Sequence, residues 1–315
     1  MESADLQDLK RRYSESITAV TTLMAKVITD EIEKTISESS LPTKIMLKIG
    51  GKKLEEEATI YISSIIVLAF EMKPVNKESI GRIISAAGLS PNQRLVDFAA
   101  SIQIAELLPY IPTAYLLKVN GLDVTEEEMV KVLSSINIKA NREAASKVLI
   151  KYKEKEASTG KAPESGSIHE KIENSIEDVA KMVSRLTNME LDRTFERKDT
   201  ISYIKDLIPY LTATAELALL GKDLGQTDSN AFKANVRAIV EALGIKPDEK
   251  MMEFVTNLNY GNALMYVPPL FFLLSINSVP NSEKIGNIAM AMGIPKDDAQ
   301  AGYVLTIYQG IKTSL

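Results

Sequence analysis

A short helical pattern occurs four times in this chain, and this repetition limits the possible folds more than any other feature. Two of the copies coincide at Glu, Ile, Gly, Ile, Ala and Gly without a gap, and the other two are more divergent. The copies are ESIGRIISAAG at 78–88, EEEMVKVLSSIN at 126–137, KANVRAIVEALG at 233–244 and EKIGNIAMAMG at 283–293. A chain of this kind repeats one small structural module.

The copies end at Gly88, Asn137, Gly244 and Gly293, which are residue types that tolerate the left-handed conformation closing many helices. Gly88 precedes Asn137 by 137 − 88 = 49 positions, and Gly244 precedes Gly293 by 293 − 244 = 49. The two pairs are offset by 244 − 88 = 156 positions. The sequence therefore predicts a tandem pair of units that is itself duplicated, with these four residues closing equivalent helices.

Each unit has the same order of elements. An apolar helix comes first, a polar loop and an amphipathic second helix follow, and a third amphipathic helix ends the unit. In unit two Thr125 with Glu128 forms a capping-box pattern, and in unit one Asn76 is a candidate cap for the second helix. The apolar first helices are expected at 61–70, 110–119, 210–220 and 266–277.

We expect the first helices to pair through their apolar faces. A tyrosine recurs at the same position of every unit, which favours a shared core or pairing surface over a ligand groove. The predicted pairing residues are Tyr61, Ile65, Leu68, Tyr110, Ala114, Leu117, Tyr210, Leu217, Tyr266, Leu270 and Leu274. A long amphipathic helix precedes each pair of units and is predicted to face it through Val20, Leu23, Val27, Ile172, Val179 and Val183.

The break between the two halves lies in KYKEKEASTGKAPESGS at 151–167, which is rich in charged and small residues and lacks apolar periodicity. We therefore predict an all-α protein of two similar helical lobes that fold separately. Lobe one spans 1–155, with a leading helix at 14–36, unit one at 60–107 and unit two at 109–153. After a linker at 156–167, lobe two spans 168–315, with a leading helix at 168–188, unit three at 203–259 and unit four at 264–313.

Composition argues against several classes of function. The 315 residues carry a net charge of −5 and neither half is basic, so the broad positive surface of a nucleic-acid-binding protein is not expected. The absence of cysteine removes disulfides, thiolate catalysis and cysteine-based metal sites. The N-terminal segment lacks the apolar core of a secretory signal, and the longest apolar run, 266–276, is shorter than the roughly 20 residues that span a bilayer. We expect a cytoplasmic protein without a membrane segment.

Unit two, YIPTAYLLKVNGLDVTEEEMVKVLSSINI at 110–138, resembles the N-terminal dimerisation domain of the acidic stalk proteins of the archaeal and eukaryotic large ribosomal subunit. Units one and four carry the closing Gly of this pattern without its Thr-Glu-Glu cap, and unit three departs most. The family's long acidic tail, which recruits translational GTPases, is not found in this sequence. The matching residues are Tyr110, Ala114, Leu116, Leu117, Gly121, Val124, Thr125, Glu126, Glu127, Val132 and Leu133, with Asn137 in place of the closing Gly.

The resemblance implies that two such domains pair through their first helices and together grip a helix of a stalk base protein. Because each pair here follows a covalently attached amphipathic helix, each lobe is predicted to supply its own base helix and to fill its own docking groove. We therefore expect a non-enzymatic interaction or scaffold protein with a protein partner, for which the resemblance suggests a ribosomal or translational setting. The alternatives are a ligand-binding protein or enzyme with a site between the lobes, and a structural subunit of a larger assembly.

No cluster of residues predicts a catalytic centre, a cofactor or a metal. His169 is the only histidine, and no partner for catalysis or metal binding is evident. The turn KIGGKK at 48–53 could bind a phosphate through its backbone amides, but it lacks a following GKS/T signature, which favours a plain turn. The acidic runs at 55–57 and 126–128 lie near predicted helix starts, where carboxylates stabilise the helix dipole.

Overall fold

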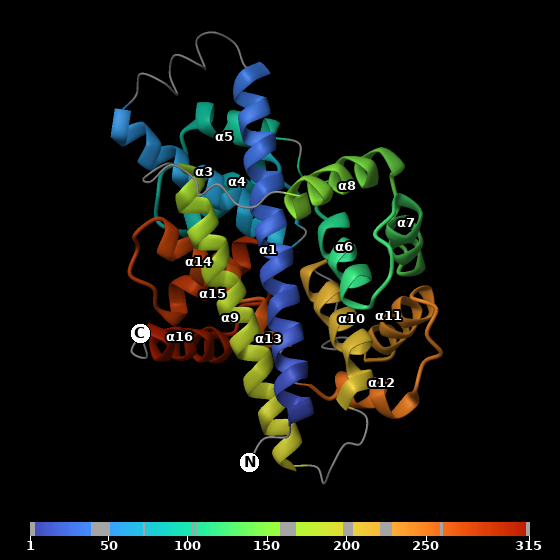
Figure 1. Cartoon of the computed structure of the whole chain (residues 1–315). Coiled ribbons are helices and arrows are strands. Elements are labelled where there is room, and N and C mark those ends of the chain that lie inside the picture. Colours follow the sequence, from blue (N-terminus) through green and yellow to red (C-terminus); the bar gives the residue numbers. More distant parts are fainter. Residues whose placement is uncertain are drawn as a thin grey trace. The chain divides into compact units, whose positions relative to one another are not determined.

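The computed structural model describes residues 4–38, 51–71, 73–102, 104, 106–157, 168–197, 204–220, 229–258 and 261–312, and every regular element in these ranges is helical (Figure 1). The predicted all-α class is therefore confirmed. Two helices are much longer than the others, α1 (Ala4–Glu38) and α9 (Ile168–Arg197). None of the described helices combines the length and apolarity needed to cross a membrane.

The shorter helices follow the predicted order within each unit. Unit one contains α3 (Gly51–Phe70), α4 (Lys77–Ala86) and α5 (Gln93–Ser101), and unit two contains α6 (Tyr110–Val119), α7 (Glu126–Ser135) and α8 (Arg142–Ala157). Unit three contains the 3-10 turn η1 (Ile204–Leu207), α10 (Ile208–Leu219), α11 (Ser229–Ala242) and α12 (Glu249–Thr256). The short helix α13 (Gly261–Leu264) follows, and unit four contains α14 (Val267–Ser275), α15 (Ser282–Ala291) and α16 (Asp298–Lys312).

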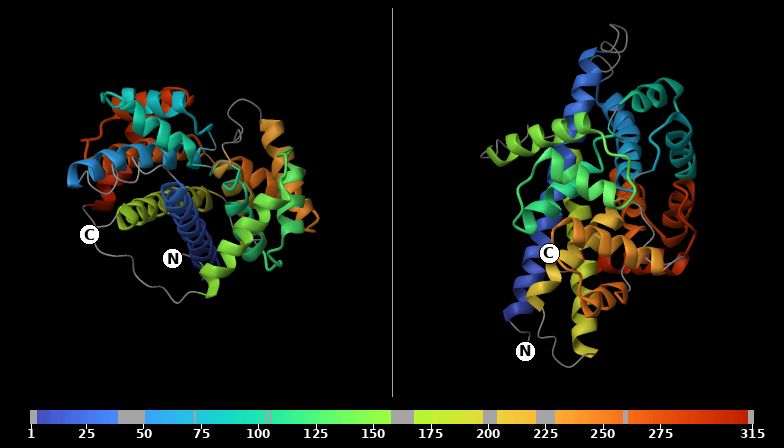
Figure 2. Two further views of the ribbon diagram at one scale, coloured as in Figure 1. Left: turned by 90° about the horizontal axis from the view of Figure 1, so that it is seen from above. Right: turned by 90° about the vertical axis from the view of Figure 1, so that its right-hand side faces the viewer.

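The helices form two compact bodies, and each body draws on both halves of the sequence. Body A comprises Met1–Leu23, Glu106–Thr159 and Ala180–Leu264, and body B comprises Met24–Ala105, Gly160–Val179 and Met265–Leu315. Body A thus joins unit two to unit three, and body B joins unit one to unit four. Figures 1 and 2 show α6–α8 beside α10–α12 in body A, and α3–α5 beside α14–α16 in body B.

Within each body, equivalent helices of the two units pack against each other. The first helices pair as α6 with α10 and as α3 with α14, and the second helices pair as α7 with α11 and as α4 with α15. Such like-with-like packing is the arrangement of a two-fold symmetric dimer, here made within one chain. The sequence prediction of pairing through the first helices agrees with this arrangement.

The predicted lobes at 1–155 and 168–315 are wrong, because neither of them is a compact body. The physical reason lies in the two long helices, since the boundary between the bodies falls inside both of them. Helix α1 begins in body A and ends in body B, so the chain reaches unit one in body B and returns to body A for unit two. The predicted leading helix at 14–36 was too short to reveal this path, whereas 35 residues extend about 50 Å.

The four helix-closing residues behave as predicted. Gly88, Asn137, Gly244 and Gly293 have φ angles of 80°, 59°, 78° and 81°, in the left-handed region. In each case the amide of the following residue donates to a carbonyl one turn back, as in a Schellman motif. These bonds run from Leu89 to Ile84 (3.1 Å), from Ile138 to Leu133 (3.0 Å), from Ile245 to Val240 (3.1 Å) and from Ile294 to Ala289 (2.9 Å). The four units therefore repeat in detailed backbone geometry as well as in sequence.

The repeated tyrosine fastens the start of the third helix in every unit. Its hydroxyl accepts a hydrogen bond from a backbone amide in three units and donates to a carbonyl in the fourth. The pairs are Tyr61 with Asn92 N (2.5 Å), Tyr110 with Asn141 N, Tyr210 with Asp248 N (2.7 Å), and Tyr266 with Pro295 O (2.6 Å). All four rings are buried. The tyrosines are thus core residues with a specific polar contact, which the sequence did not reveal.

The predicted linker begins later than expected. Helix α8 continues to Ala157, Tyr152 on it is buried, and Glu156 pairs with Lys118 at 2.7 Å. The first part of the predicted segment at 151–167 is therefore helical, and the remainder lies outside the described residues. Of the turn at 48–53, the last three residues begin helix α3 and the first three lie outside the described residues.

Candidate interaction surfaces

Most of the predicted pairing residues are buried. Within this set the structure buries Tyr61, Ile65, Leu68, Tyr110, Ala114, Leu117, Tyr210, Leu217, Tyr266 and Leu270, whereas Leu274 is half-buried. On the long helices Val20, Leu23, Val27, Val179 and Val183 are buried, and the side chain of Ile172 lies outside the described residues. The stripe on α1 therefore faces protein and not water.

In body A the first half of α1 packs against α9 in antiparallel register. The hydroxyls of Tyr13 and Thr187 are 3.2 Å apart, Asn188 donates to Ser14 at 3.2 Å, and Lys10 forms an ion pair with Asp192. From Lys10 to Tyr13 on α1 the partners on α9 run back from Asp192 to Thr187. Both helices thus supply segments to body A.

The same part of α1 also covers the paired first helices of units two and three. Tyr13, Ile17 and Val20 lie with Pro112 and Leu116 of α6 and with Thr212, Ala215 and Leu219 of α10 around a cavity of about 10 Å³, room for about one water molecule. Arg12 reaches across to donate to the carbonyl of Val119 at 3.3 Å. In body A, the apolar face made by two paired first helices is therefore occupied by a helix of the same chain.

A buried acid lies at this junction. Glu216 of α10 is 1% exposed, and its Oε1 lies 2.5 Å from Oγ1 of Thr113 on α6. Its Oε2 has no hydrogen-bond partner among the described residues. Burial away from water raises the pKa of Glu216 to about 8.

The hydrogen bonds around Thr113 agree with a protonated form of this acid. Oγ1 of Thr113 is 2.9 Å from the carbonyl oxygen of Pro109 as well as 2.5 Å from the carboxyl of Glu216. A hydroxyl carries one proton, and a carbonyl can only accept one. Each contact has a proton of its own when Glu216 is protonated and donates to Thr113 while Thr113 donates to Pro109. This arrangement agrees with the raised pKa of Glu216.

Body B also contains a buried acid, at the end of α3. Glu71 is buried, and this burial raises its pKa to about 8, against the attraction of Lys73. Glu71 and Glu216 lie at different positions within their units, since Glu71 is 71 − 61 = 10 residues after the repeated tyrosine and Glu216 is 216 − 210 = 6. The two acids therefore belong to no common motif of the repeat.

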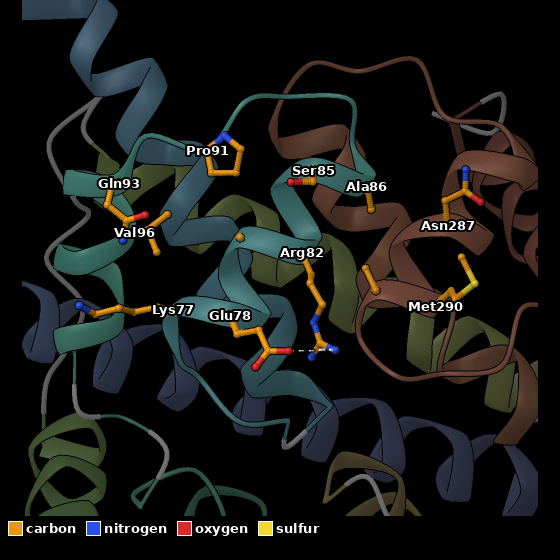
Figure 3. Close-up of a pocket in the computed structure, with 12 residues that line it drawn as sticks. Lys77, Glu78, Arg82, Ser85, Ala86, Pro91, Gln93, Val96, Asn287 and Met290 are labelled. Carbon is orange, nitrogen blue, oxygen red and sulfur yellow. Dashed lines mark ion pairs between the residues drawn. The ribbon is translucent and has the colours of Figure 1, made fainter.

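Body B contains a groove with a volume of about 920 Å³ (Figure 3). It runs between the second helices α4 and α15 and the start of α5, and Met290 on its wall is 58% exposed. Its charged residues are paired, Lys77 with Asp97 at 2.8 Å and Arg82 with Glu78 at 3.8 Å. The hydrogen bond from Lys77 makes the largest contribution to lowering the pKa of Asp97 below its ordinary value.

Gly81 of α4 lies in the lining of this groove. A Cβ atom added there would meet no atom within 4 Å, so the fold itself leaves the space open. The equivalent residues of the second helices in body A are Val130 (81 + 49) and Arg237 (81 + 156), which carry full side chains. A glycine inside a helix costs roughly 1 kcal/mol relative to alanine, and this was the signal in the sequence that could have indicated the groove.

No group of three or more His, Asp or Glu side chains in the described ranges is placed to hold a metal ion. His169 begins α9, and its side chain lies outside the described residues. The acidic run at 126–128 forms the first turn of α7, where Thr125 accepts a hydrogen bond from the amide of Glu128 at 3.2 Å. These carboxylates thus stabilise a helix start.

Comparison with known proteins gave no relative. The chain matches no protein-family model, no curated protein and no solved structure.

Proposed function

We propose that this chain is a non-enzymatic interaction or scaffold protein, built as two intramolecular pairs of a domain that resembles the ribosomal stalk dimerisation domain. The observation that carries the proposal is the packing of equivalent helices in both bodies, α6 with α10 and α7 with α11 in one, α3 with α14 and α4 with α15 in the other. A pair of small helical domains joined through their first helices leaves its remaining helix faces available to other proteins.

The face that such a pair offers to a base helix is already covered in body A. Tyr13, Ile17 and Val20 of α1 lie over α6 and α10, and their covalent attachment gives them a high effective concentration. A helix from another protein would have to displace them. The protein therefore binds its partner through a different surface.

The groove of body B is the surface best suited to a protein partner. An amphipathic helix can dock in a groove lined by helices, and the open space at Gly81 allows its backbone to approach closely. The exposed thioether of Met290 adapts to varied apolar side chains. The proposed occupant is thus an amphipathic helix of a partner protein, and the resemblance to stalk domains suggests a component of the ribosome or of translation.

Affinity capture from the native source tests this function with a matched pair of variants. Met290→Glu places a charge on the wall of the groove, and Val279→Glu places the same charge on a residue of body B that is 79% exposed and does not line the groove. We expect one defined protein to be captured by the wild type and by Val279→Glu, and to be lost with Met290→Glu. Equal capture by all three proteins would exclude the groove as the binding surface.

The same preparation distinguishes the other classes of function. Native mass spectrometry of the purified wild-type chain should show the polypeptide mass alone. A retained small molecule that is lost with Met290→Glu would instead favour a ligand-binding protein. Tight binding of an isolated base-protein helix by the intact chain would contradict the covered face in body A and would indicate a true stalk component.

A further inference from the structure

The four units differ in chemistry where the paired first helices face each other. In body A the contact joins Thr113, which is 113 − 110 = 3 residues after its repeated tyrosine, to Glu216, which is 216 − 210 = 6 residues after its own. The units can therefore be compared at these two positions, counted from the repeated tyrosine. In units one to four the third position holds Ser64, Thr113, Ala213 and Pro269, and the sixth position holds Val67, Leu116, Glu216 and Phe272.

At the sixth position, Glu216 is thus the one ionisable residue, and the other three units have an apolar residue there. It is 99% covered by protein, so its carboxyl group depends on a partner from the facing helix. Thr113 supplies that partner, and the hydroxyl of Thr113 is in turn anchored on the carbonyl of Pro109. A buried polar group without a partner costs much more than a paired one gains.

We propose that the hydrogen bond between Thr113 and Glu216 selects which repeat units pair, so that unit three joins unit two of its own chain. If unit three paired with unit four, its neighbour along the chain, Glu216 would lie opposite Pro269. Unit three on a second copy of itself would place Glu216 opposite Ala213. Neither residue has a side-chain hydroxyl, and the acid would be buried without a partner in both cases. Ser64 of unit one is the other hydroxyl at this position.

This selection is needed because the units otherwise resemble one another closely. All four close their second helices in the same left-handed geometry and fasten their third helices through the same tyrosine. Their first helices present apolar faces that are non-directional in their attraction. A buried directional pair in one interface distinguishes the correct pairing from the others, as polar core residues do in coiled coils. The same interface also contains a part-buried hydrogen bond from Nδ2 of Asn120 to Oγ1 of Thr212 at 3.2 Å.

Refolding of full-length variants tests the proposal. Thr113→Val removes the hydroxyl at nearly constant shape, Thr113→Ser keeps it, and the double variant Thr113→Val/Glu216→Leu makes the contact apolar. Ser64→Ala is the matched control, because Ser64 has the same position in body B and its hydroxyl donates to the carbonyl of Ile60 in its own helix, at 2.9 Å. Each chain is unfolded in urea, refolded at pH 6, and analysed by size-exclusion chromatography with light scattering.

The wild type, Thr113→Ser and Ser64→Ala should refold to the same species. Thr113→Val and the double variant should raise the ratio of larger, mispaired species to that species by about tenfold or more, because the correct pairing has lost its advantage. If the double variant fails to fold, the result for Thr113→Val alone tests the proposal. A wild-type distribution for Thr113→Val, or an increase for Thr113→Ser equal to that for Thr113→Val, would overturn the proposal.

Discussion

Replacing Glu216 by glutamine should remove a large part of the pH dependence of stability. Burial holds the pKa of this acid at about 8 in the folded protein, against an ordinary value of 4.5. Glutamine keeps the size and a hydrogen-bond donor for Thr113, but it carries no titrating proton. Among the described residues, Tyr13 is the other titratable side chain that lines the adjoining cavity, and one of its contacts is the hydroxyl of Thr187. The Glu216→Gln substitution therefore removes a single titrating proton.

The sign and size follow from proton linkage. Between pH 4.5 and about 8 the folded chain keeps a proton on Glu216 that the unfolded chain has released. The free energy of unfolding therefore falls as pH rises through this window, by about 1.4 kcal/mol per pH unit for one group. The stabilisation is complete below pH 4.5 and is lost on reaching about pH 8. Between pH 5 and 8 the wild type should lose about 4 kcal/mol relative to Glu216→Gln.

Urea unfolding followed by circular dichroism at pH 5, 6, 7 and 8 measures this difference. Glu71→Gln should produce a similar change through body B, since burial also raises the pKa of Glu71 to about 8. Glu143→Gln is the control, because Glu143 is exposed on α8 and its hydrogen bond with Lys147 lowers its pKa. It should not flatten the pH dependence. If the free energy of unfolding depends on pH in the same way for the wild type and Glu216→Gln, the inference that Glu216 is buried and protonated is refuted.

Three further predictions concern the packing and geometry of the repeats. Leu117→Asp in body A and Leu68→Asp in body B each place a carboxylate at a fully buried position and should cost at least about 3 kcal/mol in thermal unfolding, whereas the exposed Val279→Asp should change stability by less than about 0.5 kcal/mol. Asn137→Gly should raise the unfolding free energy by up to about 1 kcal/mol and Gly88→Ala should lower it by about 1–2 kcal/mol, because both residues have positive φ; the opposite order would contradict the left-handed geometry. Tyr210→Phe removes the acceptor for the amide of Asp248 and should cost about 1 kcal/mol in urea unfolding, while no cost would mean that water replaces the hydroxyl.

Local features of the fold could be predicted from the sequence because they depend on neighbouring residues. The order of helices follows from apolar periodicity, and the ends at Gly88, Asn137, Gly244 and Gly293 follow from the few residue types that accept positive φ. The cap at Thr125 was also predicted from a local pattern, and the structure contains it. In each case a few consecutive residues determine the conformation.

Features that depend on distant residues were missed. The bond between Thr113 and Glu216 joins residues 103 positions apart, and no local pattern connects a threonine in one unit to a glutamate in another. The groove in body B is formed by α4 and α15 together, so Gly81 alone could not indicate it in the sequence. The pairing of units was predicted from adjacency in the sequence, which is a weak guide when the four units are alike.

The loop-closure free energy of pairing distant units sets how much the interface between them must contribute to stability. Units one and two are joined by a short connection, with Ser101 and Tyr110 only 110 − 101 = 9 positions apart, whereas Ala157 and Ile208 at the ends of units two and three are 208 − 157 = 51 apart. Loop closure costs about 0.6 kcal/mol for each doubling of length, so the distant pairing is disfavoured by roughly 1.5 kcal/mol. An unpartnered buried polar group costs about 1–3 kcal/mol, which is enough to reverse that preference. One correctly placed acid can thus decide between the lobes that the sequence suggests and the interleaved bodies that the chain forms.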